Sequence, residues 1–445
     1  YAPVVAWPVV RFFLVLSLLK NWKSRQLDFV LAYTQADVET DLYMQIPTGY
    51  CKPGVSAKTH ALKLVKNLYG QKQAGRVWNK YMTERTIALG FVQSKADECV
   101  FYFNKSVMLV YTDDCIIMGP EDKELDLMVA KLKSSFDITE EGDICDYLGI
   151  KFTKQVDNSI SLTQPHLIAS ILKDLGLDKP NSKIEDTPAL SSVALTKHLD
   201  RRSHDHNHFD YRSVIGKLNY LEKSTRPDIS EAVHQCAQFS SNPRQPHTEA
   251  VKRIGRYLKG TATGGIIMQP GTVQSFECWV DASHAGEWKT EGIEDGAASA
   301  RSRMGYVFTY ANCPILWASK MQTEIALSST EAEYIALSQA MREIIPLIAL
   351  MKEAEEMKLP IIPLPPQVHC KLFEDNSGAI EIAKVPKMRP RTKHLNVKYH
   401  HFRSFVLDGT VSVHQVSTTE QVADIFTKAL NEELFEKHRL AIMGW

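Results

Sequence analysis

The segment Met108-Leu-Val-Tyr-Thr-Asp-Asp-Cys-Ile-Ile-Met118 decides our expectation for the fold. Two apolar, strand-prone runs flank Thr112, Asp113 and Asp114, which predicts a hairpin. Adjacent acids between buried strands repel each other, and desolvation penalises both charges unless a cation compensates them. Ordinary turn chemistry is the alternative, because Asp is common in turns. The segment therefore predicts either a cation site or a plain turn.

Asp28 lies in a similar setting, at the start of the apolar run Gln26-Leu-Asp-Phe-Val-Leu-Ala-Tyr33. Neighbouring strands could bring Asp28 and Asp113 together, because alternation sends Asp113 and Asp114 to opposite faces while the turn lets the second approach the same site. Two divalent ions about 3.5 to 4 Å apart, bridged by such carboxylates, would activate a hydroxyl and stabilise a leaving pyrophosphate. Hard oxygen ligands with open positions favour Mg²⁺.

Three further motifs, together with this hairpin, resemble the reverse transcriptase of copia-type (Ty1/copia) LTR retrotransposons: Tyr43-Met-Gln-Ile-Pro47, Leu68-Tyr-Gly-Gln-Lys-Gln-Ala-Gly-Arg-Val-Trp78 and Thr225-Arg-Pro-Asp-Ile229. The likeness runs over nearly the whole chain. It implies that Asp28, Asp113 and Asp114 are catalytic and bind the metal. In retroviral relatives an aromatic side chain after the first aspartate crowds the ribose 2′-hydroxyl and selects deoxynucleotides, and Tyr33 occupies that place.

Two basic stretches indicate contacts with nucleic acid. Between Ala61 and Lys80, cations occur without an acid, and Tyr69 and Trp78 lie among them. Cations interleaved with stacking surfaces are typical of nucleic-acid grooves, and a solvated helix face is the alternative. We expect substrate contacts from three residues of this stretch: Lys72, Gln73 and Arg76.

The second stretch, Lys384 to Arg403, holds seven Lys or Arg, three His and no acid. It indicates a surface that contacts the phosphates of a hybrid duplex, with a solvated basic helix as the alternative. The expected substrate contacts there are Arg391, Lys393 and His394. Metal binding or a proton relay by His394, His400 and His401 is a further hypothesis, although single histidines usually have ordinary structural roles.

A second group of acids follows the strand-like run Phe276-Glu-Cys-Trp-Val-Asp281. Gly305–Tyr310 and Ile315–Trp317 continue it as a predicted three-stranded meander. Acids on strand ends and helices that face one sheet would form a second two-metal site, where water attacks. The spacing alone does not choose between Glu331 and Glu333, which share a helix, and solvated surface carboxylates are the alternative.

The order strand acid, helix acid, strand acid, helix acid resembles ribonuclease H, a domain that copia-type elements carry after the polymerase. On that resemblance the catalytic and metal-binding set is Asp281, Glu333, Asp375 and Asp424. Many cellular ribonucleases H have a mobile His shortly before the last Asp, whereas this chain has Ser417-Thr-Thr-Glu420 there. That histidine is therefore missing, or another residue takes its role.

Composition and length exclude several classes of protein. The 445 residues predict two to four domains at roughly 100 to 200 residues each. The net charge of zero excludes a histone-like polycation. Eight cysteines without a close pair fit neither a disulfide framework nor a zinc knuckle, so we expect reduced, partly buried thiols. The apolar run Phe12–Leu19 is too short to span a bilayer and predicts a buried helix.

Some features depart from the family pattern. The basic fingers strand that normally lies upstream is absent, and the chain begins at Tyr1 rather than Met, so we expect a fragment of a longer polyprotein. Thr112 stands where Val is commoner, an exchange that should fit a strand. Gly75 stands where Pro is usual. Neither change touches a metal ligand.

The expected fold is a multidomain mixture of α+β and α/β structure: a right-hand polymerase of fingers, palm and thumb followed by a ribonuclease H-like mixed-sheet domain. We place incomplete fingers and palm in residues 1–120, and a separate helical thumb and a linker in 121–200. The connecting region takes 201–270, and the ribonuclease H-like domain takes 271–445.

The expected function is RNA-directed DNA polymerisation from a primer, with ribonuclease H cleavage of RNA in RNA–DNA hybrids. Two Mg²⁺ per active site are implied, with Mn²⁺ as a substitute. The expected partners are an RNA template, a DNA primer, the hybrid, dNTPs and other parts of the retrotransposon polyprotein, with no membrane. The location would be cytoplasmic retrotransposon particles, with the nucleus as the alternative. A catalytically inactive remnant or domesticated nucleic-acid-binding protein is the rival hypothesis.

Overall fold

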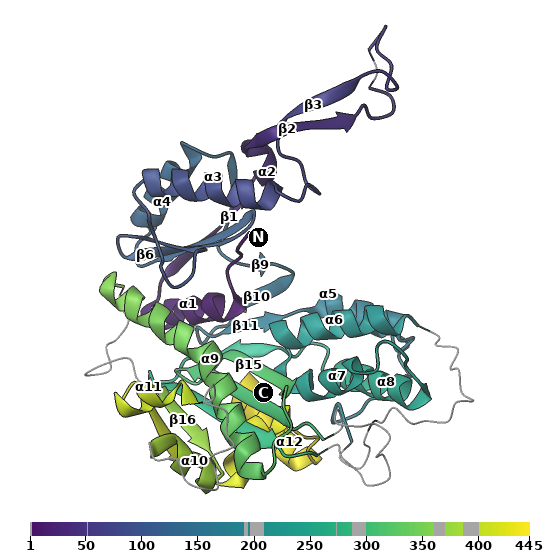
Figure 1. Cartoon of the computed structure of the whole chain (residues 1–445), viewed down its shortest axis with the longest axis vertical. Coiled ribbons are helices and arrows are strands. Elements are labelled where there is room, and N and C mark those ends of the chain that lie inside the picture. Colours follow the sequence, from purple (N-terminus) through teal and green to yellow (C-terminus); the bar gives the residue numbers. More distant parts are fainter. Residues whose placement is uncertain are drawn as a thin grey trace. The chain divides into compact units, whose positions relative to one another are not determined.

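The computed structural model describes residues 2–50, 52–190, 195, 209–272, 274–286, 300–359, 370–385 and 400–445. The chain forms two compact units (Figure 1). The first comprises Tyr1–Ala6, Leu19–Ile144 and Leu350–Ile361. The second comprises Trp7–Leu18, Cys145–Ala349 and Ile362–Trp445. Each unit is built on mixed helices and sheets, as the composition and patterning predict.

A six-stranded antiparallel sheet forms the core of the first unit, in the order β4-β5-β6-β7-β1-β8. The predicted hairpin is its centre, because the two apolar runs become β6 and β7 and are buried over nearly their whole length. The strands are β1 Lys23–Phe29, β4 Val92–Gln93, β5 Val100–Phe103, β6 Ser106–Tyr111, β7 Asp114–Gly119 and β8 Ile138–Gly142.

Two helices, α3 (Ala74–Ala88) and α4 (Asp122–Lys133), cover one face of this sheet (Figure 1). Leu125 and Met128 of α4 belong to the same hydrophobic cluster as Trp78 of α3 and as Leu27 and Ile117 of the sheet. We expected a separate helical subdomain to begin near residue 121. That expectation is wrong for α4 and β8, because the apolar stripe of α4 packs on the sheet of the first unit.

A two-stranded hairpin, β2 (Asp37–Gln45) and β3 (Ala61–Lys66), completes the first unit. The short helix α2 (Ala32–Gln35) leads into it from β1. Most side chains of β2 and β3 are exposed, so packing contributes little to their stability. Antiparallel backbone pairing joins the two strands, and exposed ion pairs of Lys63 with Asp41 and Lys66 with Asp37, both at 2.7 Å, lie across them.

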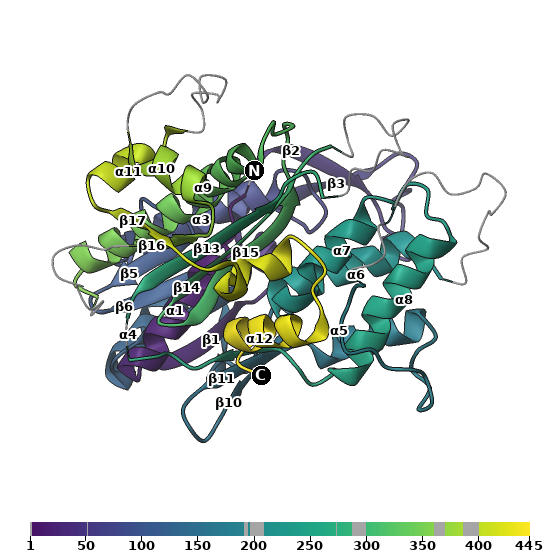
Figure 2. The same cartoon turned by 90° about the horizontal axis from the view of Figure 1, so that it is seen from below.

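The second unit contains a five-stranded sheet in the order β15-β14-β13-β16-β17 (Figure 2). Strands β13, β14 and β15 form the predicted antiparallel meander, whereas β16 and β17 add in parallel. The bounds are β13 Phe276–Ser283, β14 Arg303–Tyr310, β15 Cys313–Met321, β16 Cys370–Glu374 and β17 Val411–Gln415. Helices α9 (Ser329–Glu356), α10 (Ser377–Lys384) and α11 (Arg403–Leu407) follow in the chain between these strands.

A four-stranded sheet and a group of helices make up the rest of the second unit (Figures 1 and 2). The sheet order is β12-β11-β10-β9, with β9 Asp146–Tyr147, β10 Ile150–Lys154, β11 Ile160–Thr163 and β12 Ile266–Met268. The helices are α5 Pro165–Asp174, α6 Tyr211–Ser224, α7 Ser230–Ala237, α8 Gln245–Gly260 and α12 Glu432–Met443. Short 3₁₀ helices span Pro227–Ile229, Thr418–Glu420 and Val422–Phe426.

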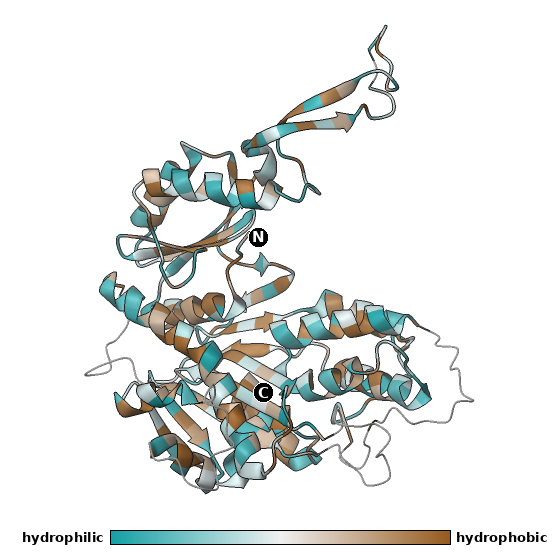
Figure 3. Cartoon of the chain, viewed as in Figure 1, coloured by the Kyte–Doolittle hydropathy of each residue, from teal (hydrophilic) through white to brown (hydrophobic). Residues whose placement is uncertain are grey.

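The apolar run near the N-terminus is a buried helix, as predicted. Helix α1 (Trp7–Lys20) is largely brown in Figure 3 and buries its side chains from Val9 to Leu16. The guanidinium of Arg11 is buried as well, and it donates to the carbonyls of Ile315 at 3.0 Å and Ser224 at 2.8 Å. These bonds satisfy a charge that would otherwise be costly inside the protein.

Helix α9 is long and apolar enough to cross a membrane by length and composition alone. Two thirds (67%) of its most apolar window is buried inside the protein, as in the core helix of a globular domain. The thiols match the expectation of unpaired cysteines: the seven described cysteines are free, and six of them are buried.

Candidate active sites

The first candidate site forms where β1 meets the β6–β7 hairpin. Antiparallel pairing places Asp28 directly opposite Asp114, and the amide of Phe29 donates to the carbonyl of Asp113 at 2.9 Å. All three aspartates are partly exposed. Strand pairing thus brings together Asp28 and Asp114, which lie 86 positions apart in the sequence.

The turn of this hairpin is strained. Thr112 has a φ of 58°, in the left-handed region that a β-branched residue rarely adopts. The indole of Trp78 donates to the carbonyl of Thr112 at 2.8 Å and fixes the turn. Our expectation that Thr112 fits a strand is therefore wrong, because the residue lies in the turn itself, where strain of about 1–3 kcal/mol must be offset by the surrounding contacts.

Burial and mutual repulsion disfavour the charged forms of these aspartates. Burial, together with the negative charges of Asp113 and Asp28, raises the pKa of Asp114 to about 6. The pKa of Asp28 is also raised, first by burial and then by the charge of Asp113. A cation placed among the three would relieve both effects, so the donor set fits a divalent metal ion.

A fourth acid, Glu141, approaches this site from β8 and was not predicted. Pairing of β8 with β1 brings Glu141 next to Gln26, whose side-chain amide donates to it. Its charge also contributes to the raised pKa values of Asp28 and Asp114. No sequence signal indicates this role, because the strand pairing that creates it joins segments far apart in the chain.

Two tyrosines lie beside the aspartates. The rings of Tyr33 and Tyr69 pack against each other in a tilted arrangement, with centroids 4.5 Å apart and planes inclined by 31°. The hydroxyl of Tyr69 donates to Oδ2 of Asp113 at 3.3 Å. Tyr33 therefore lies near Asp113, and its role at the nucleotide sugar stays a prediction. Tyr69 was noted only as a stacking surface, although its place in the Leu68–Trp78 motif was a usable signal.

The predicted substrate contacts around α3 have different surroundings. Arg76 pairs with Glu39 of β2 at 2.5 Å, and Lys80 approaches the same carboxylate at 3.7 Å. Gln73 precedes α3 and donates to Gln71 at 3.4 Å. Lys72 is exposed and forms no ion pair with any residue that the structure describes. The acids of β2 thus neutralise much of the stretch that looked uniformly basic in the sequence.

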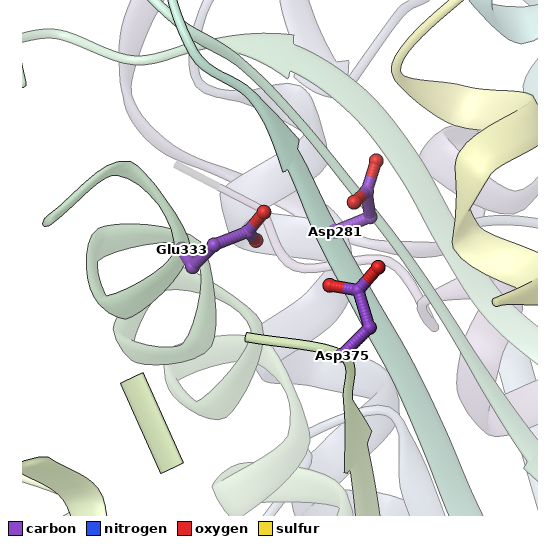
Figure 4. A group of neighbouring side chains, drawn as sticks. All are labelled: Asp281, Glu333 and Asp375. Atoms are coloured by element: carbon purple, nitrogen blue, oxygen red, sulfur yellow. The ribbon is translucent and has the colours of Figure 1, made fainter. Parts of the chain in front are cut away.

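The second candidate site lies at the carboxyl ends of two neighbouring parallel strands (Figure 4). Asp281 lies on β13 and Asp375 directly follows β16, while Glu333 reaches them from the second turn of α9. Ligand oxygens of these three acids all lie within 4.8 Å of one another. Among the described residues, this is the one group of acids, histidines or cysteines that meets so closely, and the aspartates of the first site do not.

Burial disfavours the charged forms of the acids in the second site. Burial, together with the charges of Glu374 and Asp281, raises the pKa of Glu333 to about 11. The pKa of Glu374 is raised well above its ordinary value, chiefly by burial. One carboxylate oxygen of Glu333 and one of Glu374 are buried without a hydrogen-bond partner. Orphaned oxygens beside converging carboxylates fit a divalent cation.

The structure distinguishes the two glutamates that the sequence left open. Glu331 turns back and accepts a hydrogen bond from the amide of Leu327 at 2.8 Å, as a helix-capping side chain does. Glu333 points into the acidic cluster (Figure 4). Glu374 was overlooked as a member of this site, although its position beside Asp375 at a strand end was a usable signal.

Asp424 is adjacent to the cluster but lies outside the group of three. It forms an ion pair with Lys428 at 2.9 Å, while the neighbouring hydroxyl of Thr427 donates to Asp281. Burial and the charge of Asp281 raise the pKa of Asp424 to about 7, although Lys428 lowers it. The Ser417–Glu420 segment supplies another contact, because Thr418 donates to Oδ2 of Asp375 at 2.9 Å.

The predicted contacts of the basic stretch Lys384 to Arg403 lie only partly within the described residues. Arg391, Lys393 and His394 lie outside the described residues. His400 and His401 contact α9 instead of the acids: Nδ1 of His400 lies 2.7 Å from the hydroxyl of Tyr334, and Nδ1 of His401 lies 3.4 Å from Oγ of Ser338. A metal or relay role for these histidines stays a hypothesis.

Comparison with known proteins adds an independent line of evidence. Residues 1–190 match the family model described as reverse transcriptase (RNA-dependent DNA polymerase). The chain is 33% identical over 443 residues to the retrovirus-related Pol polyprotein from transposon RE1 of Arabidopsis thaliana, covering 98% of this chain and 28% of the relative. It is 32% identical over 451 residues to that from transposon TNT 1-94 of Nicotiana tabacum, covering 98% and 32%.

A solved structure of a compost-derived ribonuclease H1, LC11-RNase H1, aligns with 37% of this chain and 98% of its own, at 13% identity and a TM-score of 0.25. The chain spans about a third of the length of the two Pol polyproteins that it matches.

Proposed function

Because this chain belongs to the reverse transcriptase region of copia-type retrotransposon Pol polyproteins, we propose that its first unit is an RNA-directed DNA polymerase. The observation that carries the proposal is the register that sets Asp28 opposite Asp114 beside Asp113. The six-stranded sheet would be the palm, and the β2–β3 hairpin part of the fingers. The thumb would begin only after β8, later than the predicted residue 121, and the connecting region and ribonuclease H-like domain would follow it.

The residues of the first site suit nucleotidyl transfer. Partly exposed carboxylates at a hairpin leave room for a primer terminus and a triphosphate. Lys72, which has no acidic partner within the described part of the chain, lies in the loop before α3. Tyr33 would lie against the sugar of the incoming dNTP. Two Mg²⁺, when bound by Asp28 and Asp113 with support from Asp114, would activate the primer hydroxyl and neutralise the triphosphate. An RNA template and a DNA primer are the proposed partners.

Primer extension on an RNA template with Mg²⁺ tests this proposal, with Asp113→Asn as the inactive variant. We expect incorporation of dNTPs by the wild type and none by the variant. Equal incorporation by both proteins, or none by either when the upstream polyprotein residues are included, would defeat the polymerase proposal. The second result would leave a nucleic-acid-binding remnant as the function.

We further propose that the second unit is a ribonuclease H that cleaves RNA in RNA–DNA hybrids. The supporting observation is the convergence of Asp281, Glu333 and Asp375 within 4.8 Å, with buried oxygens free to bind a cation. Asp424 would join them once a metal ion competes with Lys428 for its carboxylate. The protein would orient the hybrid by its backbone and 2′-hydroxyls, without reading its sequence.

Degradation of a labelled RNA–DNA hybrid tests the nuclease. The wild type should release oligonucleotides in Mg²⁺, and Asp375→Asn should not. Asp375 is partly exposed, so this substitution should leave the fold intact. Cleavage that survives in the variant would remove the proposed site.

A further inference from the structure

Tyr69 makes two contacts in the first site, and each contact involves a residue with its own proposed task. Its ring packs against that of Tyr33 in a tilted contact, and its hydroxyl donates to Asp113. The side chain nevertheless stays 50% exposed, so burial does not explain its orientation. A half-exposed aromatic that contacts both a proposed sugar-facing ring and a proposed metal ligand is well placed to couple the two.

The loop that carries Tyr69 is fixed by its own sequence. The amide of Gln71 donates to the carbonyl of Leu68 at 3.4 Å, and the side chain of Gln71 accepts from the amide of Leu68 at 3.2 Å. Gly70 follows Tyr69 with a φ of 92°, the left-handed value that a type II turn requires at its third position. Tyr69 therefore occupies the second position of a pre-formed turn and does not have to be ordered by substrate.

The hydroxyl of Tyr69 can act only as a donor toward Asp113, because a carboxylate oxygen accepts hydrogen bonds. The contact with Oδ2 at 3.3 Å therefore fixes one carboxylate oxygen of Asp113 and leaves the other directed elsewhere. The stacked ring at the same time limits the rotation of Tyr33, because aromatic pairs favour a small set of offset and tilted geometries.

We propose that Tyr69 is a positioning and specificity residue of the polymerase site: its ring holds Tyr33 against the nucleotide sugar, and its hydroxyl orients Asp113 for metal binding. This inference rests on the proposed polymerase function. It assigns two separable effects to one side chain. Loss of the hydroxyl affects the chemical step, whereas loss of the ring affects the choice between deoxyribose and ribose.

Three variants separate these effects. Tyr69→Phe removes the hydroxyl and keeps the stacking ring, and Tyr69→Leu removes both. Tyr81→Phe is the matched control, because Tyr81 lies on α3 of the same unit and packs its ring 6.0 Å from that of Trp78. Single-nucleotide incorporation gives kcat and KM for a dNTP and the matching rNTP.

Nucleotide binding is measured separately on a primer that ends in a dideoxynucleotide, where a ternary complex forms but no bond can form. This binding assay reports the preference for dNTP over rNTP without the bond-forming step. It therefore detects a loss of sugar preference even in a protein that binds substrates but turns them over slowly.

For Tyr69→Phe we expect kcat to fall about 5- to 10-fold, as for the loss of roughly one ordinary hydrogen bond, with an unchanged preference for dNTP over rNTP. For Tyr69→Leu we expect the same fall in kcat and, in addition, a loss of about 10-fold in dNTP preference in both assays. Tyr81→Phe should match the wild type.

Different results overturn different statements. If the wild type extends primers and both Tyr69 variants match Tyr81→Phe, the inference about Tyr69 is wrong and the polymerase proposal stands. If Tyr69→Phe and Tyr69→Leu lose the same properties, the separation of ring and hydroxyl roles is wrong. A wild type that neither extends the primer nor forms the ternary complex overturns the proposed function and this inference together.

Discussion

The two acidic sites use the same kinds of side chain but differ in burial. In the second unit, Asp281 and Glu333 are only 4% and 6% exposed, and burial together with neighbouring charges raises the pKa of Glu333 to about 11. In the first unit, Asp28 and Asp114 remain partly exposed, and the pKa of Asp114 rises only to about 6. The buried site must hold protons or a cation near neutral pH, whereas the exposed site can keep its charges in contact with water.

This difference follows from what surrounds each group. The buried acids lie at the ends of adjacent parallel strands beneath a helix, so their distances are fixed by the sheet and α9. The exposed acids lie at a strained hairpin whose turn is fixed by Trp78 and whose carboxylate is fixed by Tyr69. We infer that the second site binds a cation as a pre-formed cluster, while the first becomes complete when substrate arrives.

The largest expected effect tests whether the sites act independently. Asp113→Asn should lower primer extension by at least about 10³-fold and leave hybrid cleavage within a factor of two, because it removes one metal ligand of one site only. Asp375→Asn should do the reverse. Both activities are measured on each purified variant. Loss of both activities from either substitution would show that the two sites are not separable.

The next effect tests the pre-formed cluster. Mg²⁺ or Mn²⁺ should raise the melting temperature of the second unit in the absence of nucleic acid, by the equivalent of about 2.7 kcal/mol at a hundredfold excess over its dissociation constant. Asp375→Asn should abolish most of this shift and Asp113→Asn should preserve it. A shift that is equal in all three proteins, measured by calorimetry, would contradict a specific cation site at the cluster.

A smaller effect concerns pH in metal-free buffer. The folded-state pKa of Asp424 is raised to about 7 from the ordinary 3.8, so the folded state binds the proton more tightly than the unfolded state. The associated stability is complete below about pH 4 and is lost as pH rises toward 7. We expect the free energy of unfolding to fall across this window by on the order of 2 kcal/mol, which appears as a lower melting temperature. Asp424→Asn should flatten this fall. An identical pH profile for wild type and variant would contradict the raised pKa.

The smallest effect concerns Glu141 in the exposed site. Removing its charge should lower the pKa of Asp114, so Glu141→Gln should shift the acidic limb of primer extension to lower pH by about 0.2–0.5 units at low salt. The shift should shrink in high salt because Glu141 is exposed. Glu140→Gln is the control, because Glu140 immediately precedes Glu141 in β8 and pairs with Lys133 and Arg25 instead. Equal profiles for the two variants would remove Glu141 from the site.

Local patterns predicted much of the fold correctly. The buried hairpin, the buried helix near the N-terminus and the meander of β13–β15 each follow from the apolar patterning of one segment. The position of α4 was not predictable in the same way. Its charge and helical spacing indicated an amphipathic helix, but the surface that receives its apolar stripe lies on strands elsewhere in the chain.

The sequence by itself determined which residues can carry charge at the ends of apolar segments, because a carboxylate after a strand is a property of neighbouring residues. Only the tertiary structure decided which of these carboxylates meet. It set Asp28 opposite Asp114, brought Glu333 to Asp281 and Asp375, paired Asp424 with Lys428, and brought Tyr69 to Asp113. The physical reason is that strand register and helix packing fix distances between distant segments, and Coulomb energy and desolvation depend on those distances.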